Sequence, residues 1–355
     1  MPSALIFGGL CMVGRNLVTY LVENNLCHPI RVVDRSVPQT AFLSQRCADA
    51  LAKTEFLQAN LRNPASVAAC FEPSPGVSEW DFVFNCSTEE RYGQVDQVYL
   101  ERIMLVGTNC ANEAAKRNVK VFLQISTGSV YQEISNPPCG ETAPTQTQIA
   151  RTKYHLETDQ KVLETPGLNA IVVRPSLVYG PADLHRATPF LALSSVIRYK
   201  GWHLTQPHTT NPRRNSVHVY DVAAGMHHLA KWYTSTNQSG PRVFNISDES
   251  DSRQYGVFCD PLVLRMTDLM ALREELNEMS IPVWLEMLAK YQIHNTPVSP
   301  YLEEEYFSAP PTSVDGQRIV RETGFEYRYP KLVLANLEET VHEYVSQKLW
   351  PSAEL

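Results

Sequence analysis

The sequence of 355 residues lacks several features that would tie it to particular functional classes. It has no run of basic residues and a net charge of −7, which argues against nucleic acid as the main partner because phosphate binding needs clustered Lys and Arg. No apolar stretch approaches the length of about 18 residues that a membrane-crossing helix needs. The opening "MPSALIFGGL" has no charged leader region or cleavage site, so it predicts no signal peptide. We therefore expect a cytoplasmic protein without a membrane span.

The eight cysteines are scattered, with no C-x-x-C pair and no clustering with histidine. This distribution favours reduced, buried thiols and gives no sign of a metal site. Hydrophobic residues make up 43% of the chain and charged residues 19%, the composition of an ordinary globular protein with a large core. The length is suited to one large domain with a smaller lobe.

Short apolar runs alternate with amphipathic segments through the first half of the chain. Runs such as "SALIFGG", "IRVVDRS", "DFVFNCS", "KVFLQIST" and "NAIVVRPS" have the continuous hydrophobicity of parallel strands buried on both faces. This order predicts an α/β fold with a Rossmann-like doubly wound parallel sheet. After about residue 181 the alternation weakens. We predict a nucleotide-binding core of residues 1–181, to which 214–247 return, and a smaller substrate-binding lobe with C-terminal helices from residues 182–213 and 248–355.

The first strand leads into "FGGLCMVGRNL", which places Gly8, Gly9 and Gly14 between a strand and a helix. Such a turn directs backbone N–H groups and the positive helix end at a pyrophosphate. Asp34 ends the second strand in "RVVDR", where its carboxylate can accept hydrogen bonds from both adenine-ribose hydroxyls and repels a 2′-phosphate. The pattern predicts NAD as the cofactor, and the neighbouring Arg35 leaves NADP as the less favoured alternative.

In its order of motifs the chain resembles the extended short-chain dehydrogenase/reductase family of NAD-dependent epimerases, dehydratases and hydroxysteroid dehydrogenases. The resemblance covers residues 3 to about 247 and rests on "FGGLCMVG", "NLRN", "VFNCST", "STGSVY", "RPSLVYGP", "HVYDVA" and "VFNIS". It implies a small-molecule substrate and a homodimer formed through helices that include the one around Lys153. The positions that it implies for dinucleotide binding are Gly8, Gly9, Cys11, Met12, Val13, Gly14, Asp34, Arg35, Asn60, Leu61, Cys86, Ser87, Lys153, Pro175 and Val178.

Two of these cofactor positions depart from the family pattern. Cys11 stands where the family usually has glycine, and its Cβ and sulfur would crowd the pyrophosphate. Asn60 replaces a common Asp that faces the adenine amine, and the Asn carbonyl can still accept that hydrogen bond. We expect a cofactor that is displaced or held less tightly than in the family.

The catalytic positions depart further. The family mechanism uses a Tyr four residues before a Lys on one helix face, where the ammonium lowers the pKa of the phenol. Lys153 matches the Lys and Glu157 the acidic residue one turn later, but Ile149 stands at the Tyr position and cannot transfer a proton. Thr127 matches the strand hydroxyl that shares the substrate oxygen. Met104 replaces an Asn that is frequent in the family's active sites.

Two other phenols are candidate proton donors. Tyr154 lies next to Lys153, about 100° around the helix from residue 149. "KYHLE" weakly resembles the "YYxLE" pattern of the progesterone 5β-reductase and iridoid synthase group, which uses a displaced Tyr on this helix. That group also uses a Lys after the fifth strand, where this chain has Ser129. Tyr131 is the second candidate, and Lys153 keeps a role in holding the nicotinamide ribose.

The substrate-side positions favour more than one substrate class. Leu177 replaces an Asn that grips the diphosphate in sugar-nucleotide members, whereas Arg214 matches an Arg that clamps the same phosphate in some epimerases. Leu177 is closer to hydroxysteroid-dehydrogenase-like members, which take uncharged hydroxy or keto substrates. With Ser129, these positions are the expected substrate contacts.

We therefore predict an oxidoreductase or epimerase-type enzyme for a hydroxy or keto small molecule, with a non-standard proton donor. The catalytic candidates are Thr127, Lys153, Tyr154 and Tyr131. The alternative is a catalytically inactive NAD-binding sensor or scaffold, which the replacements at positions 11, 104 and 149 favour.

Overall fold

The computed structural model describes residues 1–73, 79–132, 137–202, 215–249, 266–305 and 313–351. Seven parallel strands form one sheet in the order β3-β2-β1-β4-β5-β6-β9. The order changes direction at β1, which leaves a crevice between β1 and β4 at their carboxyl ends. This topology confirms the predicted Rossmann-like α/β fold. The strands are β1 (Ala4–Phe7), β2 (Ile30–Asp34), β3 (Glu55–Gln58), β4 (Phe82–Asn85), β5 (Val121–Ile125), β6 (Ala170–Pro175) and β9 (Arg242–Ile246).

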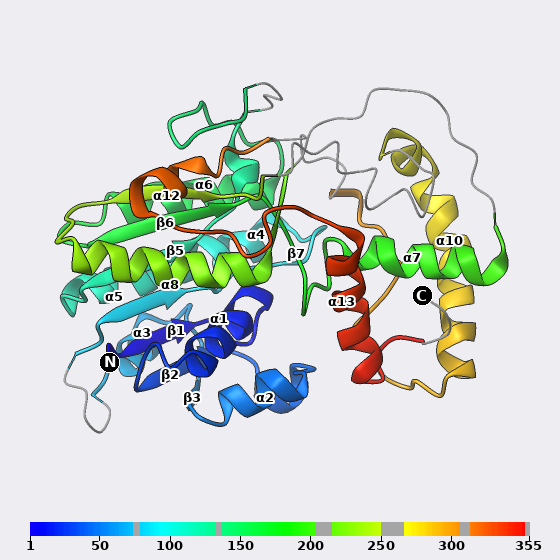
Figure 1. The fold of residues 1–355 in the computed structure, drawn as a ribbon, viewed down its shortest axis with the longest axis horizontal. Coiled ribbons are helices and arrows are strands. Elements are labelled where there is room, and N and C mark those ends of the chain that lie inside the picture. Colours follow the sequence, from blue (N-terminus) through cyan, green and yellow to red (C-terminus); the bar gives the residue numbers. More distant parts are fainter. Residues whose placement is uncertain (74–78, 133–136, 203–214, 250–265, 306–312, 352–355) are drawn as a thin grey trace.

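Helices cover both faces of the sheet (Figure 1). Successive strand residues point to opposite faces, so Ala4 and Ile6 of β1 lie on one side and Leu5 and Phe7 on the other. The first pair packs with α1 (Met12–Glu23) and α8 (Val219–Ser235). The second pair packs with α3 (Pro64–Cys70), α5 (Val106–Lys116) and α6 (Ala150–Leu163). Burial on both faces explains why β1 is apolar at every position.

The turn between β1 and α1 requires glycine at two positions. Gly8 has a φ of +71°, and a Cβ on Gly14 would lie only 2.0 Å from the carbonyl oxygen of Gly8. Cys11 caps the helix, because its Sγ accepts a hydrogen bond from the N–H of Gly14 at 3.3 Å. The same thiol donates to the carbonyl oxygen of Cys86 at 3.2 Å. These contacts hold the first turn of α1 against the carboxyl end of β4.

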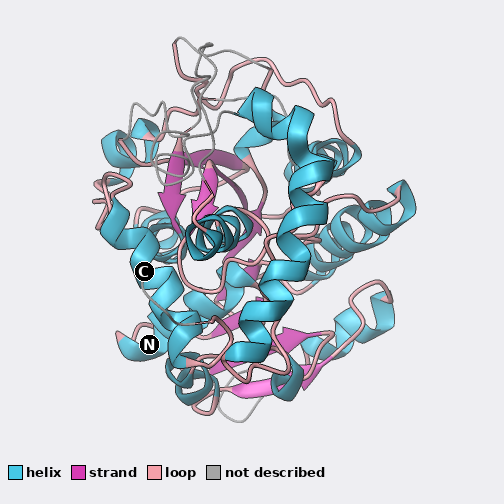
Figure 2. Ribbon diagram, turned by 90° about the vertical axis from the view of Figure 1, so that its right-hand side faces the viewer, coloured by secondary structure: helices cyan, strands magenta, loops and turns pink. Residues whose placement is uncertain are grey.

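A second apolar cluster forms a lobe beside the sheet. It contains side chains of α7 (Thr188–Lys200), α10 (Met266–Lys290) and α13 (Leu334–Ser346), which Figure 1 shows on its right-hand side and Figure 2 shows from the front. Strands β7 (Leu177–Tyr179) and β8 (Ser216–His218) form a separate small parallel pair. In the chain, β7 precedes the lobe helix α7 and β8 precedes the core helix α8.

One segment packs differently from the predicted division of the chain. Ile319 of α12 (Gln317–Thr323) and the following Phe325 belong to the cluster that joins the sheet to α1 and α8. This part of the 248–355 region therefore adds to the core and not to the lobe. None of the helices in the described residues has both the length and the hydrophobicity to cross a membrane.

Candidate functional site

A cavity of about 700 Å³ lies at the carboxyl ends of β1, β2 and β4. Its walls include the glycine turn at Gly8, Asp34 at the end of β2 and Ser87 directly after β4. Open α/β sheets bind ligands at this edge, where the strand order changes direction. Asn60 and Leu61 extend the cavity beyond β3.

Asp34 holds the glycine turn in place. One carboxylate oxygen accepts the N–H of Leu10 at 3.0 Å and the other accepts the N–H of Ser36 at 2.9 Å. The residue is 9% exposed, at the wall of the cavity. Each carboxylate oxygen can accept a further hydrogen bond, so the arrangement leaves capacity for a ribose hydroxyl.

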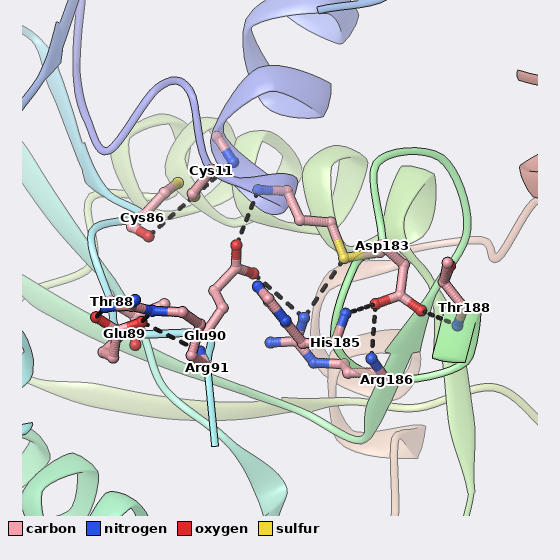
Figure 3. Close-up of polar contacts among 12 residues, drawn as sticks. Cys11, Cys86, Thr88, Glu89, Glu90, Arg91, Asp183, His185, Arg186 and Thr188 are labelled. Carbon is pink, nitrogen blue, oxygen red and sulfur yellow. Dashed lines mark hydrogen bonds and ion pairs between the residues drawn. The ribbon is translucent and has the colours of Figure 1, made fainter. Parts of the chain in front are cut away.

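Glu90 lies at the first turn of α1 (Figure 3). One of its carboxylate oxygens accepts the N–H of Met12 at 3.4 Å, and the other pairs with the guanidinium of Arg186 at 3.2 Å. Burial raises the pKa of Glu90, but Arg186, His185 and the Met12 N–H outweigh it and hold the pKa below its usual value. The carboxylate is therefore ionised and complements the positive end of the helix.

Asp183 fixes the turn that carries Arg186. This buried carboxylate accepts hydrogen bonds from four successive backbone N–H groups, at 2.6 to 3.1 Å (Figure 3). The donors are His185, Arg186, Ala187 and Thr188. The start of α7 is thereby oriented so that the Arg186 side chain meets Glu90.

Residues 88–93, which follow β4 and which we call the 88–93 segment, fold into the cleft against α6. The hydroxyl of Thr88 lies 3.2 Å from Nε2 of His155, and the carbonyl oxygen of Glu89 accepts a hydrogen bond from Nε of Arg151 at 3.1 Å. The Arg151 guanidinium also lies over the ring of Tyr92, 5.1 Å from its centre. Helix α6 therefore holds the segment from one side.

The Glu89 carboxylate holds the segment from the other side. It accepts hydrogen bonds from Nε and Nη2 of Arg91 at 2.9 and 3.0 Å, and it pairs with Arg102 of the π-helical turn Leu100–Leu105. Burial raises the pKa of Glu89, but the two guanidinium groups lower it to about 2. The segment thus places two consecutive ionised carboxylates inside the cleft.

A second pocket of about 60 Å³ lies where β5 and β6 end. Thr127 and Ser129 line it after β5, and Pro175, Leu177 and Val178 line it at and beyond the end of β6. Tyr92 lines this pocket, whereas residues 88–91 line the larger cavity, so the 88–93 segment lies between the two spaces. Arg151 and Arg186 complete the charged part of its wall.

The structure brings many of the predicted residues together in these two spaces. Gly8, Cys11, Asp34, Arg35, Asn60, Leu61 and Ser87 line the larger cavity, and Thr127, Ser129, Pro175, Leu177 and Val178 line the second pocket. The other predicted cofactor residues of this region are buried: Gly9 in the turn after β1, Met12, Val13 and Gly14 in the first turn of α1, and Cys86 directly after β4. Arg214 lies outside the described residues.

Three predicted catalytic side chains are turned away from the second pocket. Lys153 is exposed, with Nζ 5.0 Å from the centre of the Tyr154 ring. Tyr154 packs against the π-helical turn, and its hydroxyl donates to Asp96 at 3.4 Å. Tyr131 is fully buried and donates to Oδ1 of Asn245 at 2.7 Å. Among the described residues that line the second pocket, Tyr92 is the tyrosine.

The buried face of α6 carries Arg151, His155 and Asp159 at intervals of four residues. Ile149 is the residue before the first helical turn, and Lys153 falls on the opposite, exposed side. Burial lowers the pKa of His155 well below its usual value, and the nearby guanidinium groups lower it further. The spacing of four was the sequence signal that could have identified this face.

The sequence profile of the NAD dependent epimerase/dehydratase family matches residues 4–247. No curated protein sequence matches the chain at a significant level. Similar solved structures include a UDP-galactose 4-epimerase, with 16% identity, coverage of 98% of this chain and 100% of that one, and a TM-score of 0.66. A dTDP-glucose 4,6-dehydratase from Streptomyces venezuelae with NAD bound has 16% identity, coverage of 98% of both chains and a TM-score of 0.67.

The dTDP-glucose 4,6-dehydratase from Bacillus anthracis in complex with NAD has 15% identity, coverage of 99% of both chains and a TM-score of 0.68. At these identities the structural likeness concerns the fold, while the sequence profile covers more than half of the chain. Together with the glycine turn and the parallel sheet, this match shows that the chain belongs to the NAD dependent epimerase/dehydratase family.

Proposed function

We propose that the chain is an NAD-dependent enzyme of the oxidoreductase or epimerase type that acts on a hydroxy or keto group of a small molecule. The observation that supports this most directly is the cavity of about 700 Å³ that runs from Asn60 and Asp34 over Gly8. The family takes its name from NAD dependence, and two of the structures that share this fold contain bound NAD.

The residues fit the adenosine half of NAD as they stand. Asp34 offers acceptor oxygens for the ribose hydroxyls, and Asn60, Leu61 and Ser87 surround the space beside it. Arg35 lies on the same wall and keeps NADP as the less favoured alternative.

The diphosphate fits the first turn of α1 once Glu90 leaves the N–H of Met12. The carboxylate and a diphosphate would both accept hydrogen bonds from the same helix end, and two anions do not share it. In this proposal the 88–93 segment opens to admit the ligands and closes again with the Glu90 carboxylate turned away from the helix end and Tyr92 back in the wall of the pocket around Thr127.

At the reactive end, Thr127 orients the substrate oxygen and Tyr92 exchanges its phenolic proton with it. Thr127 accepts the N–H of Ser129 at 3.2 Å, which leaves its hydroxyl hydrogen free to point into the pocket. Bound NAD supplies the hydride acceptor. This assignment replaces Lys153, Tyr154 and Tyr131, whose side chains face elsewhere.

Titration of NADH and NADPH by fluorescence tests cofactor binding. We expect saturable NADH binding that is about tenfold weaker in Asp34→Asn, because the charged acceptor for the ribose is lost. Asp49→Asn, on the exposed side of α2 (Gln45–Leu51), is the matched control. Absence of dinucleotide binding to the wild type would overturn the proposal.

Turnover is then screened with hydroxy and keto compounds, including sugar nucleotides of the kind named for the similar epimerase and dehydratases. Tyr92→Phe should lower kcat at least about a hundredfold, because proton transfer of this kind contributes 10² to 10⁴. Thr127→Val should lower kcat by about a hundredfold, because the substrate oxygen loses the group that orients it. Activity that survives both changes contradicts the assigned roles.

A second candidate function is an inactive NAD-binding sensor or scaffold. The specific observation in its favour is that the 88–93 segment fills the cleft while Lys153 is exposed. Saturable NADH binding without turnover that responds to either substitution would support it.

A cytoplasmic homodimer is part of both proposals, and light scattering of the purified chain tests the dimer.

A further inference from the structure

Arg151 differs from the other buried arginines of the described chain in its partners. Arg31 pairs with Glu55 at 2.9 Å and Arg174 pairs with Asp159 at 2.8 Å. Arg151 is 5% exposed, and its contacts are the carbonyl oxygen of Glu89 and the ring of Tyr92. In the described residues no carboxylate pairs with it.

A buried guanidinium without a carboxylate is costly. Removing an ion from water carries a penalty of several kcal/mol, which an opposite charge and full hydrogen bonding normally offset. Arg151 uses Nε for the carbonyl oxygen, which leaves the N–H groups of its two terminal nitrogens without a hydrogen bond in the described structure. Since Arg151 lines a pocket, a ligand bound there can satisfy them.

The second pocket has the chemistry of an anion site. Its described lining contains no Asp or Glu, and it offers the hydroxyl groups of Thr127 and Ser129 beside Arg151. Ser176, which is 9% exposed, lines the same pocket with a buried hydroxyl that has no hydrogen-bond partner among the described residues.

The remaining charge in the wall is already balanced. Arg186 pairs with Glu90, so the unbalanced positive charge of the pocket is that of Arg151. A volume of about 60 Å³ admits a small anionic group while the 88–93 segment is in place.

We propose that the second pocket binds an oxyanion, a carboxylate or phosphate group of the substrate, with Arg151 as its ionic partner. This inference rests on the proposed function and specifies its substrate class. It replaces the uncharged substrates that Leu177 favoured in the sequence. Arg151 then anchors the charged end of the substrate while Thr127 faces the reacting oxygen.

Anion binding can be measured without dinucleotide, by calorimetry and thermal shift at constant ionic strength. The probes are inorganic phosphate, glycolate and its neutral isostere glycolamide. We expect wild-type protein to bind at least one of the anions and to ignore glycolamide. Arg151→Gln should weaken anion binding at least about tenfold, because a charge-assisted hydrogen-bond pair is lost.

Lys161→Gln is the matched control, because it removes the same charge from an exposed position of α6 and should leave anion binding unchanged. A response to phosphate alone identifies a phosphate group, and a response to glycolate alone identifies a carboxylate. An equal response in the wild type and Arg151→Gln, or no response to either anion, overturns the inference.

Should Arg151→Gln fail to fold by circular dichroism, Ser176→Ala and Ser129→Ala provide the second measurement. Each removes one neutral donor, and we expect anion binding to weaken about threefold to tenfold. Unchanged anion binding in both variants overturns the inference as well.

NADH titration of the same samples separates the two proposals. NADH binding without an Arg151-dependent anion response refutes the inference alone, whereas an anion response without NADH binding refutes the proposed function.

Discussion

The carboxylate of Glu90 and the backbone N–H of Met12 form a hydrogen bond at the first turn of α1. The N–H groups at this end of a helix carry partial positive charge and commonly receive a diphosphate. In this chain a side chain of its own neutralises that end, and Arg186 balances the carboxylate in turn. A dinucleotide therefore has to exchange its diphosphate for Glu90.

We expect Glu90→Gln to bind NADH about tenfold more tightly than the wild type. The substitution removes a competing charge at the helix end and frees Arg186 to face the ligand. Fluorescence titration measures the affinity, and Glu338→Gln at an exposed site of α13 is the control. Equal or weaker binding in Glu90→Gln would show that the carboxylate does not compete.

Cys11→Gly should also tighten NADH binding, by about threefold to tenfold, because it removes Cβ and sulfur from the wall beside Gly8. The helix cap on Gly14 is lost, and replacing a cap by Gly costs only a few tenths of a kcal/mol in unfolding free energy. Titration and urea unfolding measure the two effects. Cys11→Ser keeps both the cap and the bulk, so an identical gain in affinity there would contradict the steric reason.

Tyr131→Phe should lower the free energy of unfolding by about 1–3 kcal/mol. The change leaves Oδ1 of Asn245 without its buried donor and removes an acceptor from Arg174. Urea denaturation measures the difference, with Tyr301→Phe as an exposed control. A loss no larger than that of the control would mean that the buried network contributes little.

The buried neutral imidazole of His155 predicts a loss of stability in acid. Its pKa lies well below the ordinary value near 6.5, so below that pH the unfolded chain binds a proton that the folded chain does not. The free energy of unfolding then falls as the pH decreases, by up to about 1.4 kcal/mol per pH unit for this group.

Urea unfolding between about pH 5 and 7 measures this slope. His155→Gln should make the decline shallower, whereas His294→Gln at an exposed position should not. Parallel curves for the wild type and His155→Gln would contradict the assignment.

The sheet and the adenosine side of the site could be predicted because their signals are local in the sequence. The continuous apolar run at β1 reflects burial on two faces, and Gly8 and Asp34 stand at fixed places relative to the strand ends. A residue at the end of a strand lies at the edge of the sheet, and its position there does not depend on how the rest of the chain packs.

The reactive side could not be predicted in the same way. The interval from Ile149 to Lys153 suggested one helix face, but the helix begins only after Ile149 and buries Arg151 and His155 against the 88–93 segment. That choice of face depends on a loop from another strand. The consecutive carboxylates of the segment give no local signal, because charged loop residues are usually solvated.

The position of the 88–93 segment between the two cavities has a kinetic consequence. A molecule that spans both must wait until the segment separates from α1 and α6, so the slow event is a rearrangement of the protein and not the collision. In stopped-flow mixing the observed rate constant should then level off at high ligand concentration, and the plateau would report how often the segment opens.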